Sequence, residues 1–111
     1  MINKAEILYS EGNYSGAVEK IWDVFERIKT YYAPSLKKNK SVERVIDDIS
    51  KGNTDIQQMF ENEFRSLIDI GNSYCIRYHE VGKITVSNGI HFEYFYKRCF
   101  AVISVVLKEL Q

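Results

Sequence analysis

The chain contains few residues that interrupt a helix. It has one proline and six glycines among 111 residues, so most of the segments between them are long enough for several helical turns. Within these segments apolar residues recur at steps of three and four, the spacing of one helix face. No segment has the sustained two-residue alternation of a sheet-forming strand. The sequence therefore predicts an all-α fold, a bundle of four to five helices with mostly short connections.

Breaks in this periodic pattern place the first two helices. Gly12 is expected to end a helix over 2–11 as a left-handed C-terminal cap, and a second helix follows over about 14–32. Pro34 stops the second helix, because the residue before a proline is pushed out of the α region. The polar, basic stretch 35–40 is expected to be an exposed connection.

Capping residues place the next two helices. Ser41 is expected to cap a short third helix, which Gly52 terminates. Thr54 and Gln57 match a capping box, so a fourth helix should begin there and extend to about residue 80. Its apolar stripe includes Ile56 and Met59 near the start.

The last predicted helix, over about 89–110, is long and apolar over more than half of its circumference. Such a helix is either central in a bundle or half of a dimer interface. The segment 81–88 before it is expected to be a loop or a short extended piece. Gly71 lies inside the fourth helix, where glycine lowers the stability of the helix by ~1 kcal/mol relative to alanine. We therefore expect either that this helix bends at Gly71 or that another helix passes close to it. The residues expected to be buried on the last helix include Ile103, Val106 and Leu107.

Length and charge limit the classes of function. A chain of 111 residues is typical of one domain, so we expect residues 1–111 to form a single domain. Fifteen basic and fifteen acidic residues give zero net charge, whereas a protein that coats nucleic acid usually carries a basic excess. The zero net charge does not exclude a small RNA-binding site.

Targeting and metal-binding signals are missing from the sequence. No run approaches the ~18 apolar residues of a membrane span, and no basic region precedes an apolar N-terminal stretch, so we expect a cytoplasmic protein without membrane contact.

Cys75 and Cys99 lack CxxC spacing and are expected to be buried, reduced thiols. With only two histidines in addition, we expect no metal and no cofactor.

Reactive side chains are concentrated near residue 77. The stretch contains Asn72, Arg77, His79 and Glu80, which would lie close together if the fourth helix continued to residue 80. A histidine titrates near neutral pH and a guanidinium stabilises phosphate charge. The group therefore fits metal-independent RNA cleavage, with His79 and Arg77 catalytic and Asn72 and Glu80 binding or orienting the substrate.

The same four residues also fit purely structural roles. Arg77 and Glu80 have the spacing of a surface ion pair, Asn72 can cap a local bend, and His79 can mark the end of a helix. Spacing alone does not choose between the structural and the catalytic interpretation.

Two segments resemble a known family. The run AEILYSEGNYSGAVEKIWDVFERIK over 5–29 and the run IGNSYCIRYHE over 70–80 are similar to HEPN-like helical domains, more narrowly to the C-terminal domain of bacterial abortive-infection proteins. The resemblance implies a dimer, and in many members an RNase that uses an arginine followed four to six residues later by a histidine. Arg77 and His79 are placed at the matching helix end, but only one residue separates them.

Three functions follow from these patterns. The first is a HEPN-like module of a bacterial phage-defence or stress protein, which forms a dimer and acts on RNA as a metal-independent RNase or by binding RNA or nucleotides. The second is a non-catalytic module for dimerisation or for contact with another protein domain. The third is a small-molecule or nucleotide pocket between helices that involves the same polar residues.

Overall fold

Five α-helices make up the computed structural model, which describes residues 2–76 and 80–110. The helices are α1 (Ile2–Ser10), α2 (Tyr14–Lys29), α3 (Lys38–Ser50), α4 (Thr54–Ser73) and α5 (Gly89–Leu110). Within the described ranges no strand is present, and the only extended pairing is an isolated bridge between Tyr74 and Ile84. The predicted all-α class is confirmed.

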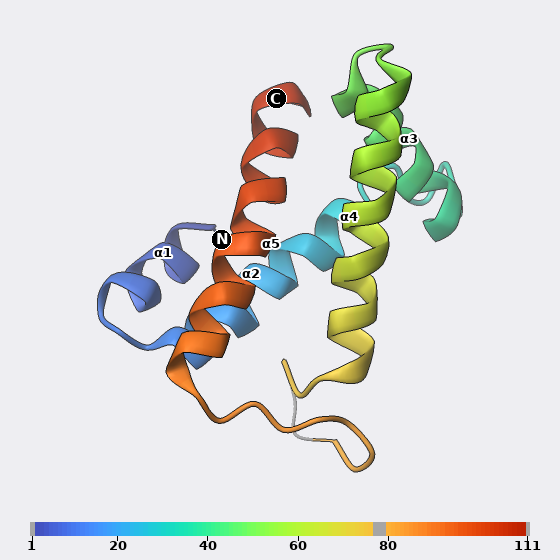
Figure 1. Cartoon of the computed structure of the whole chain (residues 1–111). Helices are drawn as coiled ribbons and strands as arrows, with labels where there is room; N and C mark the ends of the chain where they lie inside the picture. Colours follow the sequence, from blue (N-terminus) through green and yellow to red (C-terminus); the bar gives the residue numbers. More distant parts are fainter. Residues whose placement is uncertain (1, 77–79, 111) are drawn as a thin grey trace.

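Helix α2 occupies the centre of the bundle. It packs against α1, α3 and α5, and Figure 1 shows α2 crossing behind the gap between α4 and α5, which run in opposite directions. Eight of its 16 residues are buried, more than on any other helix in the described ranges. The largest fully buried side chains are Trp22, Phe25 and Phe64. The sequence left open whether the last helix is central or half of a dimer interface; in the structure α2 carries more buried residues than α5.

The ends of α1 and α2 are set by turn-forming residues. Gly12 adopts a φ of +81°, the left-handed conformation that glycine tolerates, as predicted. The Asn13 side chain then accepts a hydrogen bond from the Gly16 N–H at 3.0 Å and caps α2. Helix α2 ends at Lys29, earlier than the predicted residue 32.

Two predicted helix caps are wrong. Ser41 lies inside α3, which begins at Lys38, and its buried hydroxyl instead accepts a hydrogen bond from the Tyr32 N–H at 3.0 Å. Helix α4 is capped by Asn53, whose side chain accepts from the Ile56 N–H at 3.0 Å. Asparagine is a somewhat better N-cap than threonine, which favours Asn53 over Thr54, and the N-cap of α3 is Lys37, which makes no side-chain cap.

Helix α4 ends at Ser73 and does not continue to residue 80 as expected. Tyr74 is extended, with φ −113° and ψ 154°. The Cys75 N–H donates to the Ile84 carbonyl at 2.9 Å, and the Ile84 N–H donates to the Ser73 carbonyl at 2.8 Å. The following loop therefore satisfies the backbone groups that another helical turn would have used.

Helix α5 has the predicted length, but it is amphipathic rather than a long apolar helix. Tyr96, Cys99, Val102, Ile103 and Val106 are buried. Leu107, which was expected to be buried, is half-buried. The opposite side carries charged residues, and none of the described helices is long and apolar enough to cross a membrane.

The two cysteines differ in their surroundings. Cys99 is buried, and its burial raises the pKa of its thiol. Cys75 is half-buried on the loop after α4. Both thiols are free, so the expectation of two buried, reduced cysteines is correct for Cys99 and only partly correct for Cys75.

Gly71 lies where α4 crosses α2. A Cβ atom at this position would be 2.8 Å from Nε1 of Trp22, closer than side-chain contacts allow. The sequence predicted either a bend in the fourth helix at Gly71 or the close approach of another helix. The close approach of α2 is correct.

The burial of Ile103 predicts its contribution to stability. Because its side chain is fully buried, Ile103→Ala should lower the free energy of unfolding by ~2–5 kcal/mol. The same substitution at Ile90, on the same helix but 71% exposed, should change it by less than ~0.5 kcal/mol. Urea denaturation measures both, and similar losses for the two variants would contradict the assignment of the core face.

The contact between Gly71 and Trp22 predicts that Gly71→Ala lowers stability, although Gly→Ala inside a helix usually raises it. Gly→Ala inside a helix normally gains roughly 0.5–1 kcal/mol. Gly71→Ala should instead lose about 1–3 kcal/mol, because the added methyl overpacks against Trp22. Gly89→Ala is the control, since its Cβ would lie 3.7 Å from the Tyr14 ring, an ordinary contact. A Gly71→Ala variant with a raised melting temperature would show that α2 and α4 are not in close contact there.

Candidate functional site

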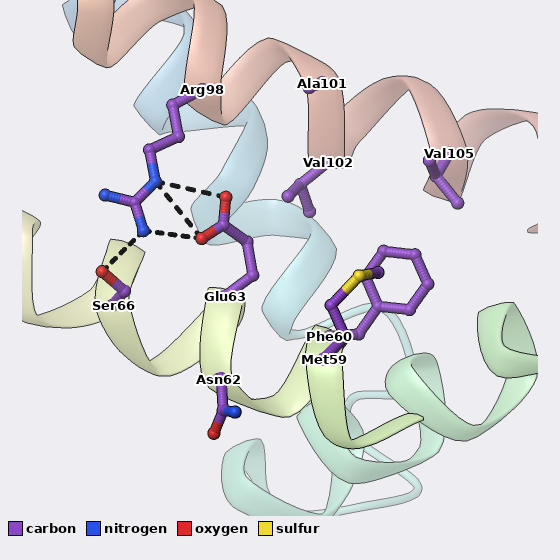
Figure 2. Close-up of a pocket in the computed structure, with 9 residues that line it drawn as sticks. All are labelled: Met59, Phe60, Asn62, Glu63, Ser66, Arg98, Ala101, Val102 and Val105. Atoms are coloured by element: carbon purple, nitrogen blue, oxygen red, sulfur yellow. Dashed lines mark hydrogen bonds and ion pairs between the residues drawn. The ribbon is translucent and has the colours of Figure 1, made fainter. Parts of the chain in front are cut away.

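An apolar groove runs between α4 and α5, with a volume of about 750 Å³. Figure 2 shows that side chains from both helices point into it. Helix α4 contributes Met59, Phe60, Asn62, Glu63 and Ser66, and α5 contributes Arg98, Ala101, Val102 and Val105.

Apolar side chains make up most of this groove. Phe60 and Val102 are 9% and 4% exposed, so they form its floor, whereas Met59 is 50% exposed at the edge. Ile56, one turn before Phe60, is also exposed. The sequence placed Ile56 and Met59 on the inward stripe of the fourth helix, but both side chains are exposed, so this part of the prediction is wrong. Large apolar side chains that line a groove mark an interaction surface more often than scattered ones do.

A polar cluster spans one end of the groove. The Arg98 guanidinium donates from Nη2 to Glu63 Oε1 at 2.6 Å and from Nε to both Glu63 oxygens at 3.2 Å. Its Nη2 also donates to the Ser66 hydroxyl at 2.7 Å, and Figure 2 draws all of these bonds. The hydrogen bonds to Glu63 raise the pKa of Arg98. Paired bonds of this kind fix geometry as well as charge, so Arg98 and Glu63 hold the two helices at a set spacing.

A second, smaller pocket of about 150 Å³ lies where α2 meets the end of α4 and the loop that follows. Its polar side chains are Trp22, Glu26, Asn72, Glu80 and Lys83. The Lys83 ammonium donates to the Gly71 carbonyl at 3.3 Å and lies 3.5 Å from Glu80 Oε1. Ile68 and Ile76 complete the wall.

Glu26 is the most strongly paired carboxylate of this pocket. Its oxygens lie 2.9 Å from the Lys29 ammonium and 3.5 Å from that of Lys38. Burial opposes ionisation, but the hydrogen bond and charge of Lys29, together with the charge of Lys38, outweigh it and lower the pKa of Glu26. The carboxylate is therefore negatively charged at neutral pH.

The four site residues predicted from sequence divide into two pairs. Asn72, exposed on α4, and Glu80, exposed on the loop, line the same small pocket. Arg77 and His79 lie outside the described residues. The predicted catalytic pair therefore stays a prediction.

Sequence reasoning missed Trp22 and Glu26 in this pocket and Arg98 and Glu63 in the groove. Trp22 and Glu26 are four residues apart and so share one face of α2. That spacing was visible, but nothing in the sequence brought this face to Asn72. Gly71 was the single indication of a close crossing, and it did not identify the partner helix.

Metal binding has no support in the described part of the chain. Over residues 2–76 and 80–110, no three His, Cys, Asp or Glu side chains gather closely enough to hold an ion. Comparison with known proteins adds no assignment, since no family model, no curated protein and no solved structure matches this chain.

Proposed function

We propose that this chain is a HEPN-like helical interaction module that pairs with a second copy of itself through the groove between α4 and α5. The observation that supports this role is the groove itself, in which Met59, Phe60, Val102 and Val105 present apolar surface next to the exposed Ile56. Covering such a surface stabilises a complex by roughly 25 cal/mol for each Å² of apolar area removed from water.

The shape of this face suits a second copy. An isologous dimer needs a surface that is complementary to itself. Here the projecting, flexible Met59 lies across the groove from the small, exposed Ala101, so the projection of one copy can enter the hollow of the other. The zero net charge of the chain removes long-range repulsion between copies.

A charge placed in the groove should separate the dimer. Ala101→Glu inserts a carboxylate against the apolar wall without disturbing the core, since Ala101 is exposed. In sedimentation equilibrium at micromolar concentration, the unmodified protein should have twice the mass of one chain and Ala101→Glu the mass of a single chain.

Asn3→Glu is the matched control, because it adds the same charge at an exposed position on α1. It should leave the dimer intact. An unmodified protein that sediments as a monomer over the whole range would contradict this proposal, as would an Ala101→Glu variant that stays dimeric.

RNA-directed activity in a bacterial phage-defence or stress protein is the second candidate function. The observation in its favour is that Asn72 and Glu80, which flank Arg77 and His79 in the sequence, line one pocket. In this proposal His79 acts as the acid or base, Arg77 stabilises phosphate charge, and Asn72 and Glu80 orient the substrate.

Cleavage of RNA without added metal tests the second candidate. His79→Ala should lower the rate by a factor on the order of 10²–10⁴, the range for loss of a general acid or base. His91→Ala is the control, because His91 is the only other histidine and is exposed on α5. If the protein cleaves no RNA in the presence of a chelator, or if the two variants lose activity equally, catalysis at His79 is excluded.

A further inference from the structure

A further pocket, named the loop pocket below, lies between the loop after α4 and the first turns of α5 and has a volume of about 860 Å³. Ile84 from the loop and Ile90 and Tyr94 from α5 line it, and each of these side chains is more than half exposed. Exposed apolar side chains gathered around a hollow mark an interaction surface. None of the described residues that line the pocket is Asp, Glu, Lys or Arg, so its walls suit an apolar, uncharged occupant.

The wall that the loop contributes is an extended segment, residues 84–88, with both ends fixed. At one end the Ile84 N–H donates to the Ser73 carbonyl at 2.8 Å, and the Ile84 carbonyl accepts from the Cys75 N–H at 2.9 Å. At the other end the Asn88 side chain accepts from the Ile90 N–H at 2.8 Å. Figure 1 shows this segment in orange, running without a helical turn to the start of α5. A segment held in this way loses little conformational freedom when a partner binds.

The backbone of this segment directs hydrogen-bonding groups away from α4. In an extended chain the N–H and C=O groups of successive residues point alternately to opposite edges. Ile84 directs both of its groups to the end of α4, so Thr85 and Ser87 direct theirs to different edges from that of Val86, Thr85 and Ser87 sharing the outer one. Thr85 and Ser87 are also exposed. A strand edge of this kind is a template for pairing with another extended chain.

The side chains of the segment place the loop pocket beside this edge. Tyr74 and Ile84 are paired in a parallel bridge, and directly paired residues present their side chains on the same face. Both line the loop pocket, as does Val86 two residues further on. The Tyr74 ring packs against that of Phe95 on α5, with centroids 5.4 Å apart, so α5 covers the same face. A strand added at the outer edge would therefore turn every second side chain toward the pocket.

We propose that the outer edge of residues 84–88 binds an extended segment of another protein, whose alternate apolar side chains enter the loop pocket. Strand addition of this kind draws affinity from main-chain hydrogen bonds and specificity from pockets for alternate side chains. A small ligand would use the pocket but not the edge, whereas an extended chain uses both. The loop pocket shares no lining residue with the groove between α4 and α5, so this proposal goes beyond the dimer and can fail separately from it.

A peptide titration of the full chain tests the proposal. The probe is the synthetic peptide acetyl-Lys-Thr-Ile-Thr-Phe-Thr-Lys amide, in which apolar residues alternate with threonine and the lysines supply solubility. In ¹⁵N–¹H correlation spectra it should move the backbone peaks of Thr85, Ser87 and His91 to saturation. The same peptide with proline in place of the central threonine should not, because proline lacks the N–H and cannot extend a strand pairing. No saturable shift, or equal shifts with both peptides, would overturn the proposal.

Hydrogen exchange of individual amides separates strand addition from other modes of docking. Saturation with the peptide should slow exchange at Thr85 and Ser87 by at least roughly tenfold and leave Val86, whose N–H points to the other edge, unchanged. Binding without this alternation would overturn strand addition. Slow exchange at Thr85 and Ser87 without peptide, increasing with protein concentration, would assign the edge to a second copy of the chain and would also overturn the proposal.

Ile90→Glu tests the pocket. It should weaken peptide binding by at least roughly tenfold, because the bound peptide would bury a carboxylate against apolar groups. Ile7→Glu is the matched control, since Ile7 is 56% exposed on α1 and does not line the pocket, and it should bind like the unmodified protein. Equal affinities of the three proteins would overturn the role of the pocket. If Ile90→Glu fails to fold, the comparison of the two peptides on the unmodified protein decides the proposal.

Discussion

The contact between Trp22 and Gly71 fixes how closely the end of α4 approaches α2. It brings the end of α4 against the middle of α2, where no larger residue than glycine fits. A second contact, between the rings of Phe25 and Phe64 with centroids 5.5 Å apart, holds the next turns of α4 on the same helix. Helix α4 therefore touches α2 through these two aromatic contacts, whereas its most extensive packing is against α3. Helix α3 packs against both α4 and α5.

The groove lies between two helices that pack on other helices rather than closely on each other. Helix α5 packs against α2 and α3, and α4 packs mainly against α3. Arg98 and Glu63 bridge the gap at one end through hydrogen bonds of 2.6 to 3.2 Å. Bidentate pairs of this kind are geometrically demanding, so the bridge resists both closure and further opening. The apolar side chains beside it stay uncovered for this reason.

Sequence patterns predicted the helices better than their ends or their neighbours. Periodicity located all five helices, and Gly12 and Gly71 were interpreted correctly, because each of these signals is local or has few physical explanations. The caps at Ser41 and Thr54 were wrong: the Ser41 hydroxyl lies inside α3 and accepts from the distant Tyr32 N–H, and the adjacent Asn53 caps α4. The early end of α4 depends on backbone pairing with Ile84, eleven residues beyond Ser73. The side of the small pocket formed by Trp22 and Glu26 depends on the crossing of α2 and α4. The only indication of this crossing in the sequence was Gly71. Asn72 and Glu80 were found because they are close in sequence as well as in space.

The groove and the small pocket lie on opposite flanks of α4, so they can act independently. With a turn of about 100° per residue, Met59, Glu63 and Ser66 point to one side. Ile68 and Asn72 point roughly half a turn away, and the core residues Phe64 and Leu67 lie between the two sets. A partner that fills the groove therefore leaves the opening of the pocket uncovered. In a two-fold dimer built on the groove, each copy would keep its own pocket, and both pockets would lie outside the interface.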